Sequence, residues 1–399
     1  MTRAAKATVP TTLLPSAASL ATLLEPHVGW VGALQGGDFH LERWLRWPGD
    51  ELGGRYRIEV LRPLRGAMDG CLFVRCGTEV RSRHEIALPE AGVVFLPYPR
   101  DDALPGLHAL VRGGARPLAW RPGRRAVVLE RAADGARSWK VLERAGFTRL
   151  AEKVRAPAWR ALEAAGLVAV TAVDEERRAI AFAAARGASL HALLARGAAP
   201  AAELLAAGLA RFATADAAYI AAGGVLPEFA VDEELHALQR ACDLAGRVVP
   251  ELAAPLARGV AALRRPSALG PEGLLHRDLH DKQLFLDLEG RGADDPAALQ
   301  LIDADTVAHG PLALDVANLA AHFVLRELQG LARDGRERAR ALLAAAKCST
   351  RGAASPARFF LATSLLRLAA VYALRPRHAA LVAPLLERAQ QVIAKGTLS

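Results

Sequence analysis

The sequence has 399 residues, of which 52% are hydrophobic and 5% aromatic, and its formal net charge at pH 7 is +9. A chain of this length exceeds a single hydrophobic core, so two or three lobes are expected. The positive charge is spread in short runs such as 121–125 and 333–340 without interleaved aromatic residues, which argues against a nucleic-acid partner. The four cysteines lack zinc-knuckle spacing, and they predict reduced thiols in a cytoplasmic protein.

The first part of the chain predicts a leader and then a strand-rich segment. Residues 1–25 are expected to be a flexible leader, because Pro15 and the short apolar run argue against a secretory signal. No stretch approaches transmembrane length, so no membrane partner is expected. In residues 26–115, short apolar runs broken by Gly, Pro and Asp predict a strand-rich N-terminal extension.

Residues 116–185 predict a small lobe of strands followed by a helix. Two apolar runs flank Asp134 and Gly135, a dipeptide typical of a tight β-hairpin, and Lys140 lies on the second strand. The helical stretch that follows is interrupted by Pro157. This segment is therefore expected to form a compact β-rich unit.

Residues 186–399 predict a large helical lobe, because Ala and Leu recur there with helical periodicity. Two of its segments are different in character. Residues 274–286 (LLHRDLHDKQLFL) have apolar ends and a polar centre, which predicts a strand, a tight loop and a second strand. Residues 298–315 begin with an apolar strand that ends at Asp303 and Asp305.

A hairpin formed by these two segments would bring Asp278, Gln283 and Asp303 close together. These residue types suit phosphoryl transfer, in which an Asp accepts the proton of the attacking hydroxyl. An amide side chain five residues later and an Asp on the next strand hold the metal ions that bridge the nucleotide phosphates. An H-R-D sequence followed by such an amide is the pattern of kinase catalytic loops.

Together these motifs resemble the aminoglycoside phosphotransferase family within the protein-kinase-like superfold. Gln283 and His280 are most similar to its bacterial sugar-kinase branch, which includes maltokinases. The resemblance spans residues 116–399 and implies an α+β, two-lobed fold, with a small β-rich lobe and a large helical lobe. It also implies ATP and Mg²⁺ as cofactors, and transfer of the γ-phosphate to a hydroxyl of a small molecule. In this interpretation Asp278 is the catalytic base, and Gln283 and Asp303 hold the metal.

The resemblance also implies roles for residues of the small lobe. Lys140 on its strand is expected to bind the phosphates of ATP, and Glu152 on the following helix is expected to fix the lysine. Glu163, beyond the proline, is the alternative partner. The backbone of residues 183–185 is expected to be the hinge between the lobes, where adenine binds to the main chain.

Further residues near the loop have supporting roles in this interpretation. His276 is expected to be a packed loop histidine, and Asp315 an acid at a helix N-terminus that also braces the catalytic loop. His280 is expected to contact the transferred phosphate or to shape the loop. Asp305 departs from the family pattern and is interpreted as a solvated acid, with a second metal contact as the alternative.

Two alternatives from other classes remain open. A catalytically silent kinase-like protein that binds a nucleotide or a partner is consistent with Gln283 in place of Asn, with the D-A-D sequence and with the missing Gly-rich loop. A metallohydrolase would use ligands drawn from His276, Asp278, His280, Asp281, Asp303, His309 and His322. A protein acceptor is less favoured because the segment between Asp303 and Asp315 is short. A neutral sugar or metabolite alcohol is favoured over a polycation, and the sequence makes no prediction about oligomeric state.

Overall fold

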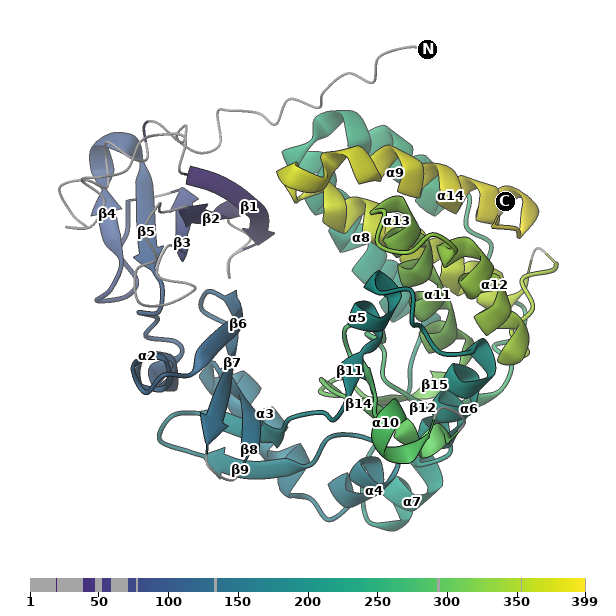
Figure 1. The fold of residues 1–399 in the computed structure, drawn as a ribbon. Helices are drawn as coiled ribbons and strands as arrows, with labels where there is room; N and C mark the ends of the chain where they lie inside the picture. The colour runs from purple at the N-terminus through teal and green to yellow at the C-terminus, as the bar shows by residue number, and fades with distance from the viewer. Residues whose placement is uncertain are drawn as a thin grey trace. The chain divides into compact units, whose positions relative to one another are not determined.

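The computed structural model describes Ser19 and residues 39–46, 52–58, 71–76, 78–132, 135–292, 295–352 and 354–398 (Figure 1). The chain divides into two compact units. Unit 1 comprises residues 1–152, 170–184 and 373–379, and unit 2 comprises residues 153–169, 185–372 and 380–399. The leader predicted at 1–25, apart from Ser19, lies outside the described residues, and so does Asp134.

Unit 1 contains two five-stranded antiparallel sheets, with the orders β1-β2-β3-β5-β4 and β6-β7-β8-β10-β9. The hairpin predicted near Gly135 is present, since β7 and β8 pair up to Ala132 and Gly135. The strands of the first sheet are β1 (Phe39–Arg46), β2 (Leu52–Ile58), β3 (Cys71–Cys76), β4 (Ile86–Leu88) and β5 (Val93–Pro97). Those of the second are β6 (Arg116–Arg121), β7 (Arg125–Ala132), β8 (Gly135–Leu142), β9 (Val170–Asp174) and β10 (Ala179–Ala183).

The two sheets of unit 1 share one hydrophobic core. Helix α2 (Pro105–Arg112) connects them, and its Leu107 and Leu110 belong to the same buried cluster as Phe73 of β3 and Trp120 of β6. The loop before α2 is fixed by buried Asp101, which accepts hydrogen bonds from Trp120 Nε1 at 3.1 Å and from the Gly123 amide at 2.8 Å. The extension therefore packs on the second sheet through apolar side chains and one buried carboxylate.

Unit 2 is mainly helical, so the predicted α+β fold with a β-rich part and a helical part is confirmed. The predicted break at Pro157 is also present, between α3 and α4. Most of helix α3 (Arg144–Arg155) belongs to unit 1, which includes residues up to 152. The helices that follow are α4 (Trp159–Ala164), α5 (Leu190–Ala195), α6 (Ala202–Ala213), α7 (Asp216–Ala221), α8 (Val231–Val248), α9 (Ala253–Ala261), α10 (Leu288–Arg291), α11 (Ala313–Leu328), α12 (Gly335–Ala345), α13 (Pro356–Ala373) and α14 (Val382–Lys395). The strands of unit 2 are β11 (Ala188–Ser189), β12 (Glu272–Leu275), β13 (Leu284–Leu286), β14 (Leu299–Leu301) and β15 (Ala308–Pro311).

One stretch of unit 2, residues 202–221, is long and apolar enough to cross a membrane, which the sequence interpretation did not anticipate. In the structure it is two helices, because α6 ends at Ala213 and α7 begins at Asp216. Helix α6 packs against α12 and β12 through buried leucines and Phe212. Helix α6 is therefore packed within unit 2, whereas Tyr219 is the only buried residue of α7.

Helix α11 forms the centre of unit 2. Every residue of α11 except His322, Glu327 and Leu328 is buried, as expected for a helix surrounded by other elements. Its buried side chains include Asp315 and Arg326, which are charged. Buried charges need partners, and these partners lie in the loop between β12 and β13.

Candidate active site

The loop of residues 276–283 connects β12 and β13, as the sequence predicted. β12 pairs with β15, and β13 pairs with β14, so the loop is anchored at both ends by antiparallel strands. A turn closes its second half, in which the Gln283 amide donates to the His280 carbonyl at 2.9 Å. The Ile302 amide donates to the Gln283 carbonyl at 3.0 Å. Gln283 and Asp303 therefore lie near each other, at the ends of neighbouring strands.

Asp315 at the start of α11 holds the first half of the loop. Its two carboxylate oxygens accept hydrogen bonds from the backbone amides of His276, at 2.6 Å, and Arg277, at 2.9 Å. Burial raises the pKa of Asp315 despite these hydrogen bonds. The carboxylate thus contacts the loop backbone at the place where the sequence resemblance implies a brace.

His276 lies beneath the loop and is fully buried. Its Nε2 is 2.9 Å from the Ile302 carbonyl oxygen, which can only accept, so Nε2 carries a proton. The Thr306 hydroxyl donates to the His276 carbonyl at 3.1 Å. His276 therefore connects β12 to the segment that follows β14, and it contacts the protein core rather than a reacting group.

Two residues of this region have left-handed backbones without being glycine. Arg277 has a φ of 71° and Asp303 a φ of 65°. Such conformations cost about 1–3 kcal/mol each and persist where the surroundings hold them. The Arg277 amide is held by Asp315, and its guanidinium contacts Glu233 at 2.8 Å and lies 5.5 Å from the centre of the Phe229 ring. Backbone strain thus coincides with the loop and with the predicted metal-binding Asp.

A stripe of four polar residues on α11 faces the loop. Their spacing of three, four and four residues places them on one side of the helix. Asn318 Nδ2 donates to the Leu279 carbonyl at 2.7 Å. We call this set the α11 polar stripe, and its members are Asp315, Asn318, His322 and Arg326.

Arg326 forms a buried ion pair with Asp281 of the loop. Its Nε and Nη2 lie 2.7 and 2.8 Å from the two carboxylate oxygens, and both side chains are almost completely buried. His191 of α5 adds an Nδ1 contact of 2.7 Å to the same carboxylate, and its backbone amide donates to the Asp281 carbonyl at 3.0 Å. Although burial opposes ionisation, the contacts from His322 and Arg326 hold the pKa of Asp281 well below its usual range.

His280 stacks on His322, with ring centroids 4.9 Å apart and an angle of 26° between the ring planes. Burial, followed by the neighbouring His322, lowers the pKa of His280 to about 4. His280 Nδ1 accepts a hydrogen bond from the Lys282 amide at 3.2 Å, which requires an unprotonated Nδ1. Near neutral pH His280 is therefore an uncharged ring packed into the loop.

The cluster of His280, Asp281 and His322 has the residue types of a metal site, but its geometry does not suit one. One ligand atom of each residue lies within 4.8 Å of the others. The two rings are nearly parallel, so their nitrogen lone pairs do not converge on a single ion. Arg326 also occupies both oxygens of Asp281 and would repel a cation.

Gln283 and Asp303 suit Mg²⁺ better. Gln283 is 4% exposed, and its side-chain oxygen Oε1 is buried without a hydrogen-bond partner among the described residues. Buried polar atoms are rarely left unsatisfied, and an amide oxygen and a carboxylate are hard oxygen ligands of the kind that Mg²⁺ prefers. These two residues fit a magnesium ion.

The small-lobe residues lie in unit 1. Lys140 on β8 is 5% exposed, and its Nζ lies 5.6 Å from the centre of the Phe182 ring on β10. Glu152, at the end of α3, is exposed. Glu163 belongs to unit 2 and pairs with Arg160 at 2.6 Å. The lysine therefore lies on a strand, as predicted, and the structure also shows it to be buried. The identity of its carboxylate partner stays a prediction.

Several residues of the site were missed by the sequence interpretation. Asn318, Arg326 and His191 were not singled out, and Asp281 was considered only as a metal ligand. Arg367 was not included either, and it contacts Glu234 at 2.9 Å and the Asn318 side-chain oxygen at 3.0 Å. The available signal was the regular spacing of polar residues in an otherwise apolar helix.

Comparisons with known proteins give structural similarity only. No family model matches the sequence, and no curated protein matches it. An aminoglycoside phosphotransferase from Streptomyces rimosus is 18% identical with a TM-score of 0.46, over 67% of this chain and 99% of that one. A choline/ethanolamine kinase family protein from Mesorhizobium loti is 14% identical with a TM-score of 0.42, over 70% and 88%. A macrolide 2'-phosphotransferase from Brachybacterium faecium is 16% identical with a TM-score of 0.39, over 72% and 97%. At these values the similarity concerns the fold alone, and the functional argument depends on the geometry of the site.

Proposed function

We propose that the protein is a small-molecule kinase that transfers the γ-phosphoryl group of ATP to a hydroxyl. One observation carries this proposal. Gln283 immediately precedes β13, Asp303 follows its partner strand β14, and the loop that leads into β13 presents Asp278 as an exposed carboxylate. A proton acceptor on a held loop beside two oxygen ligands for a metal is the arrangement that phosphoryl transfer needs.

Asp278 is the base in this proposal, and it accepts the proton of the acceptor hydroxyl at a carboxylate oxygen. Its two neighbours in the chain are both anchored to α11. The Arg277 amide donates to Asp315, and the Leu279 carbonyl accepts from Asn318. The backbone on either side of Asp278 is therefore fixed, which positions the base without restraining its side chain through another residue.

Gln283 and Asp303 provide the oxygen ligands for Mg²⁺. When bound, Mg²⁺ bridges phosphate oxygens and neutralises the charge that develops during transfer. Lys140 on β8 is proposed to bind the phosphates, and its position on a strand and its burial are consistent with a lysine held in a fixed direction.

The charges on α8 favour a neutral acceptor over a polycation. A polycationic acceptor would need unpaired acidic side chains, and the sequence offers a short acidic run at the start of α8. All three of its acids contact an arginine: Asp232 with Arg265, Glu233 with Arg277 and Glu234 with Arg367. We therefore propose a sugar or another uncharged metabolite alcohol as the acceptor.

The nucleotide site is tested by thermal unfolding with an ATP analogue and Mg²⁺, together and separately. Ligand at about 100 times its dissociation constant stabilises the folded state by about 2.7 kcal/mol. We expect a magnesium-dependent stabilisation in the wild type that is lost in Asp303→Ala. Asp243→Ala is the matched control, because it removes an exposed carboxylate on α8. An Asp303→Ala protein with full ATP-dependent turnover would refute the metal assignment.

A catalytically silent nucleotide-binding protein is the second candidate, and the use of Gln283 is the feature that favours it. ATP turnover with a panel of sugars, polyols and an aminoglycoside separates the two. Nucleotide binding with no phosphorylated product for any acceptor supports the silent protein. Turnover that disappears in Asp278→Asn, while nucleotide binding persists, supports the kinase.

A further inference from the structure

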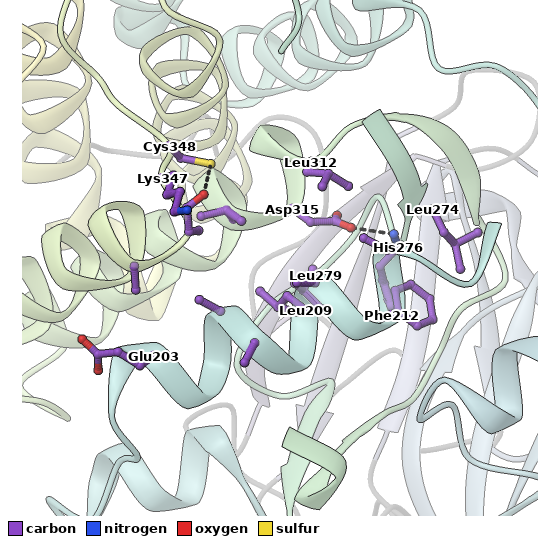
Figure 2. Close-up of a pocket in the computed structure, with 17 residues that line it drawn as sticks. Glu203, Leu209, Phe212, Leu274, His276, Leu279, Leu312, Asp315, Lys347 and Cys348 are labelled. Carbon is purple, nitrogen blue, oxygen red and sulfur yellow. Dashed lines mark hydrogen bonds between the residues drawn. The ribbon is translucent and has the colours of Figure 1, made fainter. Parts of the chain in front are cut away.

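A cavity of about 380 Å³ lies behind the catalytic loop, entirely within unit 2 (Figure 2). Helix α6 forms one wall, and the end of α12 with the residues after it forms another. His276, Leu279 and Asp315 close the cavity on the side of the loop. Its volume is in the range of small-molecule sites.

The lining of the cavity is mostly apolar, with its exposed charges at one end. Figure 2 shows Glu203 and Lys347 at one side of the lining residues and His276 with Phe212 at the other. Glu203 and Lys347 are exposed and of opposite sign, so they favour neither an anion nor a cation. At the far end the Asp315 carboxylate already accepts two backbone hydrogen bonds. A ligand charge at this inner end would therefore be buried without an opposite charge beside it, which is strongly unfavourable.

We propose that this cavity binds a small, uncharged and mainly apolar molecule. Its binding stabilises the form of the catalytic loop in which the His276 and Arg277 amides donate to Asp315. The site differs from the one proposed for nucleotide and acceptor, since Asp278, Gln283 and Asp303 do not line it. The apolar walls provide the contact area, and an uncharged polar end of the ligand faces the solvated rim at Glu203 and Lys347.

The loop and the cavity share the same residues. His276 and Asp315 line the cavity and are joined by the 2.6 Å hydrogen bond from the His276 amide, and Leu279 is the residue whose carbonyl is held by Asn318. A ligand in van der Waals contact with these side chains opposes their displacement. Binding in the cavity is therefore coupled to the opening of the loop, because a loop that leaves Asp315 loses part of the cavity wall.

N-phenyl-1-naphthylamine is a suitable probe, because it is uncharged and its fluorescence rises in apolar sites. Its sulfonated relative 8-anilino-1-naphthalenesulfonate adds a negative charge to almost the same shape. We expect saturable binding of the uncharged probe, and binding of the sulfonate weaker by about tenfold or more. Absence of saturable binding up to about 1 mM overturns the site. Equal binding of both probes overturns the uncharged ligand class.

Phenylalanine substitutions of neighbouring alanines test where the probe binds. Ala345 lines the cavity at the end of α12, and its neighbour Ala344 is exposed and does not line it. Ala345→Phe is expected to weaken probe binding by about tenfold, and Ala344→Phe by less than about twofold. Ala210→Phe on α6 fills the cavity from the opposite wall and serves if Ala345→Phe folds poorly. Equal effects of the lining and control variants overturn the location.

The coupling between probe binding and the loop is measured by hydrogen exchange at the backbone amides of His276 and Arg277, which donate to Asp315. The probe should slow their exchange in the wild type and in Ala344→Phe, but not in Ala345→Phe. Saturable binding with unchanged exchange overturns the stabilisation of the loop. None of these measurements uses nucleotide or phosphate transfer, so their outcome is independent of the proposed kinase activity.

Discussion

Replacing Arg326 by methionine should destabilise unit 2 strongly. The substitution keeps much of the side-chain volume but leaves Asp281 buried without its bidentate cation. Breaking a buried ion pair by removing one partner costs about 3–5 kcal/mol. His191 at 2.7 Å and His322 at 3.6 Å remain beside the carboxylate and offset part of the loss. We therefore expect a decrease of about 3 kcal/mol in the free energy of unfolding, measured by urea titration at neutral pH.

Arg338→Met on α12 is the matched control. Arg338 also pairs with an acid, Asp334 at 2.9 Å, but both side chains are partly exposed, so its loss should cost about 0.5 kcal/mol or less. An Asp281→Leu and Arg326→Met double variant should recover part of the stability lost in Arg326→Met, since no unpaired charge stays buried. Equal costs for Arg326→Met and Arg338→Met would refute the buried ion pair as the anchor of the loop.

Three other substitutions test separate features. The pKa of His280 is lowered to about 4 in the folded protein from its usual value of 6.5, so between these pH values the unfolded chain binds one more proton than the folded chain. The free energy of unfolding should therefore fall as the pH decreases from 6.5 to 4. This fall should be smaller in His280→Gln when unfolding is measured across that range. Asp315→Asn keeps the side-chain shape but removes one of the two carboxylate oxygens that accept hydrogen bonds from backbone amides, so the free energy of unfolding should decrease by about 2 kcal/mol. In steady-state assays kcat should fall more than tenfold, while the KM values for ATP and acceptor stay nearly unchanged. Gly187→Ala would place a Cβ 1.9 Å from the Leu286 carbonyl oxygen at a φ of 74°, so it should clearly lower the melting temperature. Gly197→Ala is the control, because Gly197 also has a positive φ but lies in open space, and this substitution should lower the free energy of unfolding by only about 1 kcal/mol.

The hairpin of the site could be predicted because its signals are local. Apolar runs on both sides of a short polar segment predict a strand, a loop and a strand, and β12, β13 and β14 occur there. The hairpin at Gly135 was predictable for the same reason. Helix α2 was not included in the predicted strand-rich extension, because its Pro105 and Gly106 are typical of a turn as well as of a helix start.

The contacts that hold the loop could not be predicted in this way. Asp281 resembles an ordinary solvated loop acid until Arg326, 45 residues later, is placed against it. Likewise, Arg367 reaches Asn318 from a separate helix 49 residues away. Pairings of this kind depend on how helices pack, and no short window of sequence contains both partners. Only the regular spacing of the α11 polar stripe was visible beforehand.

Unit 1 combines N-terminal strands with residues 373–379, and this has a consequence for when the unit can finish folding during synthesis. The Trp44 amide of β1 donates to the Leu374 carbonyl at 2.9 Å, and residues 373–379 belong to unit 1. Chains emerge from the ribosome from the N-terminus onward, and early segments often fold first. Here β1 must wait until nearly all of unit 2 has been translated before it meets this partner. During that interval the Trp44 amide, on an edge strand of the first sheet, lacks the hydrogen-bond acceptor that it has in the complete structure.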